Sequence, residues 1–390
     1  MNTRRHLNAV ALTANDLGVL AAALDGSGPA LLPLPANAHE AQRITAALLP
    51  ADPAHPLERD NIALVMPTSG STGEPKGALL TADNLTSSAE ATHERLGGPG
   101  TWLLALPLTH IAGIQVLVRS IVAGTTPQIQ HIEDGFRVED FILATAALHA
   151  TATVGRRYTA LVPTQLARLL GGGATEALTT YDGVLIGASA TPPALLARAR
   201  NHGINVVTTY GMTETSGGCV YDGRPLHGVA LSITDNQRIR IRGPMVFAGY
   251  RLRLDLTASA LQDGWHLTND LGRVTPEGTL EVLGRVDDVV VTGGMNVAPD
   301  DVAAALREHP GVEHADVHGR PDPTWGQRVV AVIVPTDPGS PPTLRELRDL
   351  VGEKLGGAAA PRAMAIVHAL PMLATGKPDR EALQRLTVEP

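Results

Sequence analysis

The sequence predicts a large layered α/β domain at the N-terminus, closed by a β-rich subdomain, and a small α+β domain at the C-terminus. Short apolar runs alternate with helical stretches through the first half of the chain. Further on, β-like segments are separated by Asp-Gly and Glu-Gly turns, and after Gly284 the alternation of strand and helix begins again. Alternating strands and helices are typical of layered α/β folds, and the restart indicates a second domain.

The first half supplies most of the predicted α/β layer. Its short apolar runs indicate strands, which we expect at Ile62–Met66, Trp102–Leu106, Tyr158–Val162, Val184–Ile186 and Asn205–Thr209. Helices are expected at Pro163–Leu170 and Pro192–Arg200. The β-rich subdomain is expected around Arg238–Arg242, with turns at Asp263-Gly264 and Glu277-Gly278.

The C-terminal domain is predicted to be a compact unit of about a hundred residues. Strands are expected at Val289–Thr292, Ala315–His318 and Val329–Pro335. Helices are expected at Pro299–Glu308 and Thr343–Lys354. Residues Pro338–Pro342 are expected to form a loop inside this unit. We therefore place the N-terminal domain at residues 1–284, a boundary segment at 285–288 and the C-terminal domain at 289–390.

Composition narrows the class of protein. The 390-residue chain is 44% hydrophobic, has a mean hydropathy of +0.05 and a formal net charge of −8, which favours a globular enzyme. Positive charge is not clustered and aromatic residues make up only 3%, so we expect no nucleic-acid partner. No apolar run approaches the roughly 18 residues that span a bilayer. We therefore expect no membrane insertion. Because the single cysteine, Cys219, cannot form an internal disulfide, we also expect a reducing, cytoplasmic location.

A loop rich in glycine and hydroxyl groups follows the first predicted strand. It contains Thr68, Ser69, Gly70, Ser71, Thr72, Gly73 and Lys76. Converging backbone N–H groups, hydroxyls and one lysine suit a polyphosphate, whereas the alternative is a flexible surface loop. The loop differs from a Walker A loop because Lys76 follows Pro75 and precedes the strand-like Gly77–Leu80, and the helix begins only near Thr81 or Asp83.

Further motifs follow this loop along the chain. They are Leu106-Pro-Leu-Thr-His110, Thr209-Tyr-Gly-Met-Thr-Glu214, Thr268-Asn-Asp270, Gly284-Arg-Val-Asp-Asp288 with Gly293-Gly294, and Ala374-Thr-Gly-Lys-Pro-Asp-Arg380. With the loop, they closely resemble the adenylate-forming superfamily of acyl-CoA synthetases, carrier-protein adenylation domains and luciferases. The resemblance implies an ATP-dependent acid–CoA ligase that first makes acyl-AMP and pyrophosphate and then passes the acyl group to CoA.

The resemblance also implies how ATP and Mg²⁺ bind. Besides the loop, the implied contacts to ATP and AMP are Tyr210, Gly211, Thr213, Asp270 and Arg285. Tyr210 would stack on adenine, Thr213 would contact the α-phosphate, and Asp270 would bind the ribose hydroxyls, with Arg285 as a ribose or phosphate partner. Glu214 would hold Mg²⁺, for which one protein carboxylate suffices because ATP supplies further oxygen ligands.

The remaining implied roles concern the mobile domain. Lys377 would lie between the attacking carboxylate and the α-phosphate, where its charge stabilises the transition state, and it completes a catalytic set with Thr213 and Glu214. Asp287, in the segment 285–288, would be the hinge. Rotation of the C-terminal domain about this hinge would bring Gly293-Gly294 to the site, where glycines leave room for the pantetheine arm of CoA.

The implied acyl pocket consists of small and polar residues, namely His110, Gly113, Thr164, Gly187, Ala188 and Ser189. They indicate a compact, hydrogen-bonded acid. Arg157 could answer a second carboxylate, although a solvated Arg156–Arg157 pair at a strand edge is an equal alternative. The early phosphate loop, which implies a shortened N-terminal subdomain, and the stretch Arg156–Leu166 most resemble the o-succinylbenzoate–CoA ligases of menaquinone biosynthesis in high-GC bacteria.

Several alternatives stay open. The acid could be another aromatic or small acid, or the protein could be a stand-alone adenylation enzyme that loads a carrier protein. A non-catalytic nucleotide-binding protein is disfavoured by the presence of Lys377 and Glu214. A catalytic role for Cys219 is disfavoured because adenylation needs no protein nucleophile.

One residue departs from the motifs of the superfamily. In the Thr268–Asp270 motif Asn269 replaces the usual glycine, and we expect its tolerance of left-handed angles to preserve a turn. The superfamily often forms homodimers, so a homodimer is an expected assembly.

Overall fold

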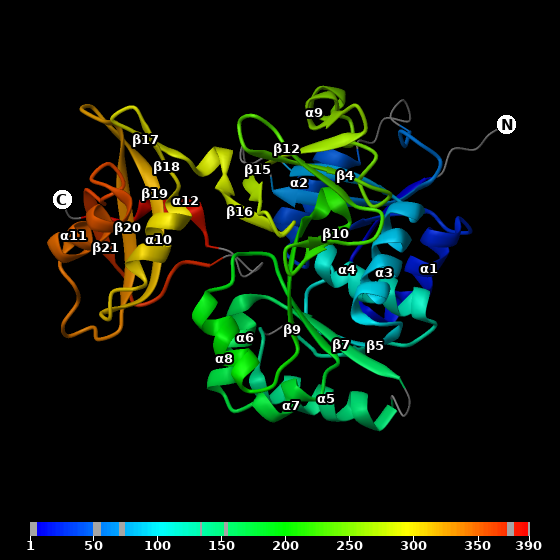
Figure 1. Cartoon of the computed structure of the whole chain (residues 1–390). Coiled ribbons are helices and arrows are strands. Elements are labelled where there is room, and N and C mark those ends of the chain that lie inside the picture. Colours follow the sequence, from blue (N-terminus) through cyan, green and yellow to red (C-terminus); the bar gives the residue numbers. More distant parts are fainter. Residues whose placement is uncertain are drawn as a thin grey trace. The chain divides into compact units, whose positions relative to one another are not determined.

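The structure is a computed structural model that describes residues 6–49, 56–69, 75–132, 135–151, 155–372 and 378–388. Backbone contacts divide the chain into two compact units (Figure 1). The first comprises Met1–Ser232 and Arg240–Leu267, and the second comprises Ile233–Ile239 and Thr268–Pro390. The predicted hinge at residues 285–288 concerns motion and stays a prediction.

A four-stranded sheet in the first unit carries the base of the phosphate loop. Its order is β1 (Leu7–Val10), β2 (Ala30–Pro33), β3 (Ile62–Ser69) and β4 (Pro75–Thr81). The first three strands are parallel, whereas β3 and β4 form an antiparallel hairpin that pairs Thr68 with Lys76. Strand β3 continues past its predicted end at Met66 because Pro67–Ser69 pair with Pro75–Gly77.

A seven-stranded sheet forms the centre of the first unit. Its order is β11 (Arg224–Pro225), β10 (Gly217–Tyr221), β9 (Val206–Met212), β8 (Gly183–Ile186), β7 (Arg156–Leu161), β5 (Gly100–Leu104) and β6 (Gln128–Ile129). Strands β6, β5, β7, β8 and β9 are parallel, and β10 and β11 are antiparallel additions. The strands predicted in the first half are present, although β5 ends at Leu104 and β9 extends to Met212.

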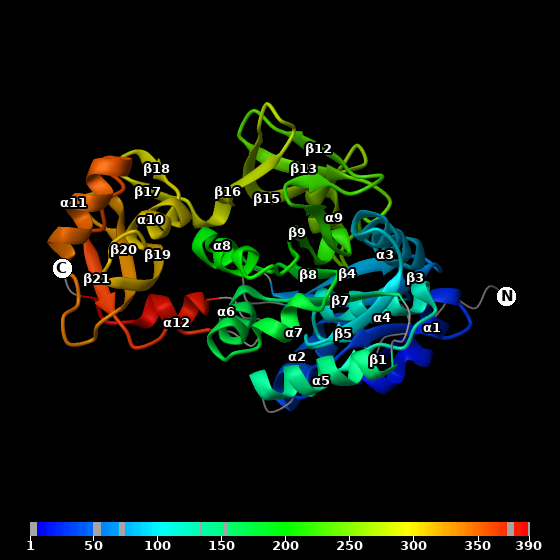
Figure 2. The same ribbon diagram turned by 60° about the horizontal axis from the view of Figure 1, so that its bottom comes forward.

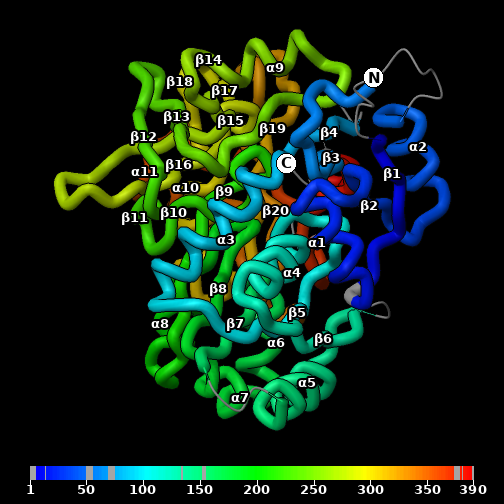
Figure 3. The backbone as a smooth tube through the Cα atoms, turned by 90° about the vertical axis from the view of Figure 1, so that its right-hand side faces the viewer, coloured from blue at the N-terminus to red at the C-terminus, as the bar shows by residue number. Residues whose placement is uncertain are grey.

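Helices cover both faces of this sheet (Figures 2 and 3). On one face, α3 (Ala82–Leu96) and α4 (Ile111–Ala123) share a core with α1 (Leu17–Asp25) and the four-stranded sheet. The other face packs against α5 (Val138–Thr151), α6 (Pro163–Gly171), α7 (Thr175–Thr179) and α8 (Pro193–Asn201). The helices predicted at Pro163–Leu170 and Pro192–Arg200 are therefore confirmed as α6 and α8. None of the described helices combines the length and the apolar character needed to cross a bilayer.

The entry to α3 shows why it begins where the sequence predicts. Thr81 precedes the helix, and its Oγ1 accepts a hydrogen bond of 3.0 Å from the backbone N–H of Asn84. The Asn84 side chain in turn accepts one of 2.9 Å from the Thr81 backbone N–H. This reciprocal cap satisfies N–H groups that have no partner inside the helix. Helix α2 (Ala38–Leu48) packs through Ile44 and Leu48 on the four-stranded sheet.

The division between the units passes through a third sheet. Its order is β12 (Ala230–Ile233), β13 (Arg238–Arg242), β15 (Trp265–Val274) and β14 (Leu261–Gln262), and β16 (Leu280–Arg285) pairs with β15. The predicted Asp263-Gly264 turn joins β14 to β15, with φ of 50° and 78°. Two positive φ angles in a two-residue hairpin loop are the signature of a type I′ turn. Helix α9 (Leu254–Ala260) precedes β14.

The second unit contains a smaller α+β fold. Its sheet has the order β18 (Met295–Val297), β17 (Val290–Thr292), β20 (Gly326–Pro335) and β19 (Val312–Asp322), and β21 (Ala363–Ile366) pairs with β20. Helices α10 (Pro299–Leu306) and α11 (Leu344–Leu355) pack on it, and α12 (Arg380–Arg385) follows near the C-terminus. The predicted elements are present, but β19 and β20 are longer than predicted because they pair along nearly their whole length.

Candidate active site

The β3–β4 hairpin holds the ends of the predicted phosphate loop. Thr68 is paired with Lys76, and its Oγ1 donates a hydrogen bond of 3.4 Å to the Lys76 carbonyl oxygen. Ser69 is the last residue of β3. Four predicted phosphate contacts, Gly70, Ser71, Thr72 and Gly73, lie outside the described residues.

The predicted adenine motif lies where β9 turns into β10. The turn residues Thr213–Thr215 form a single 3₁₀ turn, and Ser216 follows with a φ of 52°. The Thr215 hydroxyl accepts a hydrogen bond of 2.9 Å from the Met212 N–H and donates one of 2.7 Å to the Gly217 carbonyl. Gly211 is required, since a Cβ there would lie 2.1 Å from the Gly217 carbonyl oxygen. Tyr210 is therefore presented from a strand end whose backbone is closely fixed.

Glu214 is held at both ends by the segment that follows β13. Its backbone carbonyl accepts a hydrogen bond of 2.9 Å from the Phe247 N–H. Its carboxylate oxygen Oε1 accepts one of 2.7 Å from the Tyr250 hydroxyl. Burial, and secondly the negative charge of Glu214, raise the pKa of Tyr250 well above its usual value, so the hydroxyl remains a donor.

The surroundings of Glu214 fit the predicted magnesium ion. No group of three His, Cys, Asp or Glu side chains in the described part of the chain is arranged to hold a metal ion by itself. A half-buried carboxylate with one oxygen bound to Tyr250 suits Mg²⁺, which takes most of its ligands from phosphate and water. When bound, the ion would neutralise phosphate charge and orient the triphosphate.

The predicted acyl-pocket residues lie at one edge of the seven-stranded sheet. His110 caps α4 after β5, Thr164 follows β7 at the start of α6, and Gly187–Ser189 follow β8. Because β5, β7 and β8 are adjacent and parallel, their carboxyl ends bring these residues to the same edge. Such edges are the usual ligand sites of open α/β sheets.

Two glycines at this edge permit close backbone approaches. A Cβ on Gly113 would lie 2.3 Å from the Pro107 carbonyl oxygen, so only glycine lets the first turn of α4 pack against the preceding loop. A Cβ on Gly187 would lie 2.3 Å from Oγ1 of Thr209 on the neighbouring strand β9. The next residue, Ala188, has a φ of 71°, a conformation that costs energy for a residue with a side chain.

Arg157 is not brought together with these residues. It lies at the start of β7, and therefore at the edge of the parallel sheet opposite to His110 and Thr164. Its backbone N–H donates a hydrogen bond of 2.8 Å to Asp182, and the neighbouring Arg156 forms an ion pair of 3.6 Å with the same carboxylate. The position matches the strand-edge alternative rather than a contact to a second carboxylate of the substrate, because side chains at opposite ends of a strand cannot reach one ligand.

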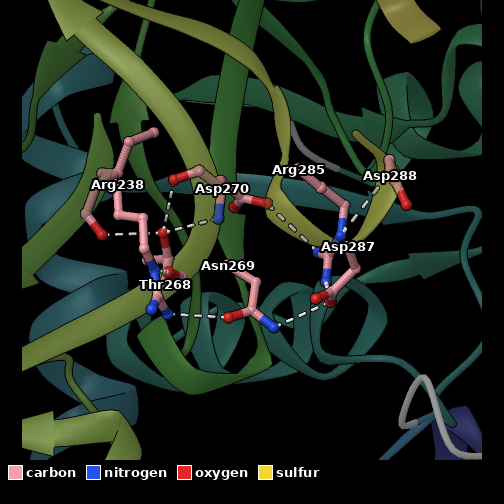
Figure 4. A network of polar contacts seen from close by, with 8 residues as sticks. Arg238, Thr268, Asn269, Asp270, Arg285, Asp287 and Asp288 are labelled. Atoms are coloured by element: carbon pink, nitrogen blue, oxygen red, sulfur yellow. Dashed lines mark hydrogen bonds and ion pairs between the residues drawn. The ribbon is translucent and has the colours of Figure 1, made fainter. Parts of the chain in front are cut away.

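The predicted ribose and hinge residues form one polar network in the second unit, shown in Figure 4. Arg285 lies 3.3 Å from Asp270, 3.4 Å from Asp287 and 4.0 Å from Asp288. Asn269 donates a hydrogen bond of 3.0 Å to Asp287. The expectation of a left-handed turn at Asn269 is wrong, because the residue lies inside strand β15 and is absent from the described non-glycine residues with positive φ.

The predicted CoA-binding glycines form the turn between β17 and β18. Gly293 and Gly294 have φ of 56° and 80°, and a Cβ on Gly293 would lie 2.9 Å from the Trp325 ring. Lys377, the predicted catalytic lysine, lies outside the described residues. Met372 and Pro378, which flank its segment, form an isolated antiparallel bridge.

Cys219 has the properties of a structural residue. Its side chain is fully buried in β10, and burial raises the pKa of its thiol to about 12. A thiol that is neither ionised nor exposed is a poor nucleophile. The structure thus agrees with the interpretation that adenylation does not use this cysteine.

Comparison with known proteins assigns the chain to a family. Residues 9–251 match the family described as AMP-binding enzyme, and residues 301–377 match the AMP-binding enzyme C-terminal domain. The chain belongs to the AMP-binding enzyme family. This family membership confirms the resemblance to adenylate-forming enzymes and the predicted fold class of a large α/β domain followed by a small C-terminal domain.

Relatives within the AMP-binding enzyme family carry one recurring name. A probable 2-succinylbenzoate–CoA ligase of Mycobacterium tuberculosis is 47% identical over 383 residues, which are 97% of each chain. A 2-succinylbenzoate–CoA ligase of a Geobacillus species is 33% identical over 84% of this chain and 69% of its own.

Solved structures of this family agree with that pattern. The o-succinylbenzoate CoA synthetase of Bacillus subtilis in complex with its acyl-adenylate intermediate is 28% identical, with a TM-score of 0.77, over 99% of this chain and 89% of that one. The same enzyme in complex with ATP and a magnesium ion is 29% identical, with a TM-score of 0.73, over 97% and 84%. The predicted class of enzyme, an AMP-forming acid–thiol ligase with ATP, Mg²⁺ and CoA, is confirmed at the level of the family.

Proposed function

We propose that this chain is an o-succinylbenzoate–CoA ligase that forms o-succinylbenzoyl-AMP from ATP and then transfers the acyl group to CoA, in menaquinone biosynthesis. The observation that carries the proposal is the 47% identity to a probable 2-succinylbenzoate–CoA ligase over 97% of both chains. The small and polar edge formed by His110, Thr164 and Gly187–Ser189 supports a compact acid.

In the first half-reaction we assign the residues of the chain as follows. The Thr68–Lys76 loop binds the polyphosphate of ATP, Tyr210 stacks on adenine, and Asp270 binds the ribose. Glu214 would hold the metal ion, which would neutralise charge on the phosphates. Lys377 places a positive charge between the carboxylate and the α-phosphate, where negative charge grows as the carboxylate oxygen attacks phosphorus and pyrophosphate leaves.

In the second half-reaction the CoA thiol attacks the acyl carbonyl and AMP leaves. We propose that rotation about Asp287 replaces the Lys377 segment by the Gly293–Gly294 turn. Two successive glycines with positive φ make a turn without side chains, which supports passage of a narrow pantetheine arm.

Location and assembly are also proposals. Since ATP and CoA are co-substrates, we place the reaction in the cytoplasm. We propose a homodimer as the assembly.

The proposal is tested with a panel of acids. Purified protein is given ATP, Mg²⁺ and CoA with o-succinylbenzoate, substituted benzoates or medium-chain acids, and pyrophosphate release and CoA thioesters are measured. The expected result is turnover of o-succinylbenzoate at the highest kcat/KM. Turnover of another acid without turnover of o-succinylbenzoate would refute the substrate.

The same assay separates the alternative acceptors. Formation of acyl-AMP from o-succinylbenzoate that then reacts with a phosphopantetheinyl carrier protein, but not with free CoA, would indicate a carrier-protein adenylation enzyme. Binding of ATP without release of pyrophosphate with any acid of the panel would indicate a non-catalytic nucleotide-binding protein.

A further inference from the structure

Tyr250 lies outside every motif that predicted the active site, yet its hydroxyl donates a hydrogen bond of 2.7 Å to Glu214 Oε1. We propose that Tyr250 is a positioning residue for the binding of Mg²⁺ with ATP. By holding Oε1, it fixes the carboxylate so that Oε2 is presented to the metal ion. The inference rests on the proposed role of Glu214 as the magnesium ligand.

Tyr250 is itself held in place before any ligand arrives. Its backbone N–H donates a hydrogen bond of 2.8 Å to Oγ1 of Thr257 in α9. Its ring packs edge-on against Phe247, with ring centroids 4.8 Å apart and an interplanar angle of 70°. Phe247 packs in the same manner against the buried His266, at 5.2 Å. The hydroxyl is therefore aimed by a rigid group of rings rather than by a mobile side chain.

The same segment also fixes the backbone of Glu214. The Phe247 N–H donates to the Glu214 carbonyl at 2.9 Å, so residues 247 and 250 bind the two ends of one glutamate. A glutamate side chain loses considerable rotamer freedom when it is ordered. A short hydrogen bond to a charged oxygen is one of the stronger bonds that can order it in advance of binding.

Backbone hydrogen bonds join this segment to the strand behind the phosphate loop. The Leu79 N–H donates to Gly249 O at 2.9 Å, the Ala248 N–H to Leu79 O at 2.8 Å, and the Arg251 N–H to Gly77 O at 2.8 Å. Strand β4 contains Lys76 at its start. The segment 247–251 thus joins the proposed metal ligand, Glu214, to the strand that carries the proposed phosphate ligand, Lys76, through one group of hydrogen bonds.

A positioning role and a merely structural role predict different results. If the hydroxyl only stabilises the fold, its removal lowers stability and changes ATP binding equally with and without Mg²⁺. If it positions Glu214, its removal weakens ATP binding only when Mg²⁺ is present. Its effect must also disappear once the Glu214 carboxylate has been replaced.

The experiment measures ATP binding by calorimetry in the absence of acid, with excess Mg²⁺ or with a chelator, for Tyr250→Phe, Glu214→Gln and the double variant. We expect Tyr250→Phe to weaken binding about ten-fold in Mg²⁺, the size expected for one hydrogen bond to a charged group, and to leave binding in chelator unchanged. We expect the double variant to match Glu214→Gln alone. Additive losses, or equal losses with and without Mg²⁺, would overturn the proposal.

Tyr181→Phe is the matched control, because the buried Tyr181 hydroxyl also bonds one side chain, Oγ1 of Thr145 at 2.8 Å. It should bind ATP like the wild type under both conditions. If Tyr250→Phe does not fold, Thr257→Val, which removes the hydroxyl that holds the Tyr250 N–H, should show the same Mg²⁺-selective loss in smaller degree. A wild-type protein whose ATP affinity ignores Mg²⁺ would overturn the proposed role of Glu214 itself, whereas a Mg²⁺-dependent wild type with an unaffected Tyr250→Phe would overturn only the role of Tyr250.

Discussion

Asn269 changes the electrostatics around the proposed hinge residue. Its amide oxygen accepts a hydrogen bond of 3.0 Å from Arg238, and its amide nitrogen donates one of 3.0 Å to Asp287. A glycine, which is usual at this place in the superfamily motif, could make neither contact. The uncharged Asn269 side chain therefore connects the Arg238 guanidinium of β13 to the carboxylate of Asp287, the proposed hinge residue.

Asn269→Asp should reveal this link. The new carboxylate would keep the contact to Arg238 but face Asp287 without an N–H to donate. Because the gain toward Arg238 is an exposed ion pair of small value, the lost bond and the repulsion should outweigh it, and the free energy of unfolding should fall by roughly 1 kcal/mol. Because the groups are exposed, the loss should shrink as salt is added. Urea unfolding at low and high ionic strength measures both effects, with Asn269→Gly as the control that removes the bond without adding charge. A loss that is independent of salt would contradict the electrostatic explanation.

His93 is a buried neutral base in the core of the first unit. Its Nε2 accepts a hydrogen bond of 3.3 Å from the Trp102 indole N–H, and its side chain is only 5% exposed. Burial, and secondly the charge of Arg119, lower the pKa of His93 from 6.5 to about 4. Since the unfolded chain binds a proton near pH 6.5 and the folded chain does not, folding loses stability as the pH falls from about 6.5 to about 4.

We expect this histidine to cost the protein up to about 3 kcal/mol of stability over that range. His93→Gln keeps an acceptor for Trp102 but does not titrate, so its unfolding free energy should fall less steeply between pH 6.5 and pH 4. Urea unfolding at several pH values gives the two slopes. Identical slopes would show that His93 binds its proton equally well in the folded and the unfolded chain, and would contradict a lowered pKa.

At the residue scale, motifs predicted site positions that are separated widely in the sequence, but they could not predict Tyr250. The reason is physical: the Tyr250–Glu214 contact depends on the chain path between β13 and α9, not on spacing within a motif. Arg157, for which two interpretations were open, shows a second limit of sequence patterns. Its chemistry suited a carboxylate, but strand β7 places it at the edge of the sheet opposite to His110 and Thr164, which only the parallel strand order reveals.

At the scale of elements, the junction of β8 and β9 shapes the proposed acyl pocket. Gly187 follows β8 and lies beside Thr209 of β9. A Cβ on Gly187 would lie only 2.3 Å from the Thr209 Oγ1 atom, so the hydroxyl occupies the space that a side chain would need. The Thr209 hydroxyl also donates to the Ile186 carbonyl at 3.3 Å. The two strands can therefore pair closely only because one residue has no side chain.

Gly187→Ala should destabilise the first unit by roughly 1–3 kcal/mol, the usual cost of overpacking. Removing the obstructing hydroxyl in Gly187→Ala/Thr209→Ala should recover much of that loss, since the next contact, to the Thr209 carbonyl oxygen, would be 3.3 Å. Free energies of unfolding for the two single variants and the double variant form the test. Losses that simply add would mean that the contact does not limit the packing.

Apolar runs predicted the strands of both units well, whereas their ends depended on pairing. Strand β9 extends beyond Thr209 to Met212 because β10 folds back on it, and β19 reaches Asp322 because β20 pairs with it. Neither partner could be identified from a local pattern, since a one-strand window contains no information on what lies beside it. For the same reason the parallel sheet order was available only from the structure.

At the scale of the whole molecule, the proposed mechanism assigns the two half-reactions to different parts of one mobile domain. In this proposal Lys377 would serve adenylation, whereas Asp287 and the Gly293–Gly294 turn would serve transfer to CoA. The two functions should therefore be separable by mutation, which would be impossible if one fixed arrangement performed both steps.

Lys377→Ala should lose acyl-AMP formation by several orders of magnitude and still transfer acyl groups from supplied acyl-AMP to CoA. Asp287→Pro, which restricts the backbone at the hinge, should form acyl-AMP and fail in transfer. Rapid-quench assays of each half-reaction measure both rates. Lys354→Ala is a surface control, since that lysine pairs with Glu308, and it should leave both rates unchanged. Equal loss of both half-reactions in both variants would contradict separate roles.

The most direct test of the account follows the oxygen atoms of the acid. The purified enzyme is given o-succinylbenzoate labelled with ¹⁸O in its carboxylates, together with ATP, Mg²⁺ and CoA, and the nucleotide products are analysed by mass spectrometry. Attack of a carboxylate oxygen on the α-phosphorus, followed by transfer to CoA, predicts one ¹⁸O in AMP and none in pyrophosphate. Unlabelled AMP, or label in a product derived from the β- or γ-phosphate, would contradict an acyl-adenylate mechanism.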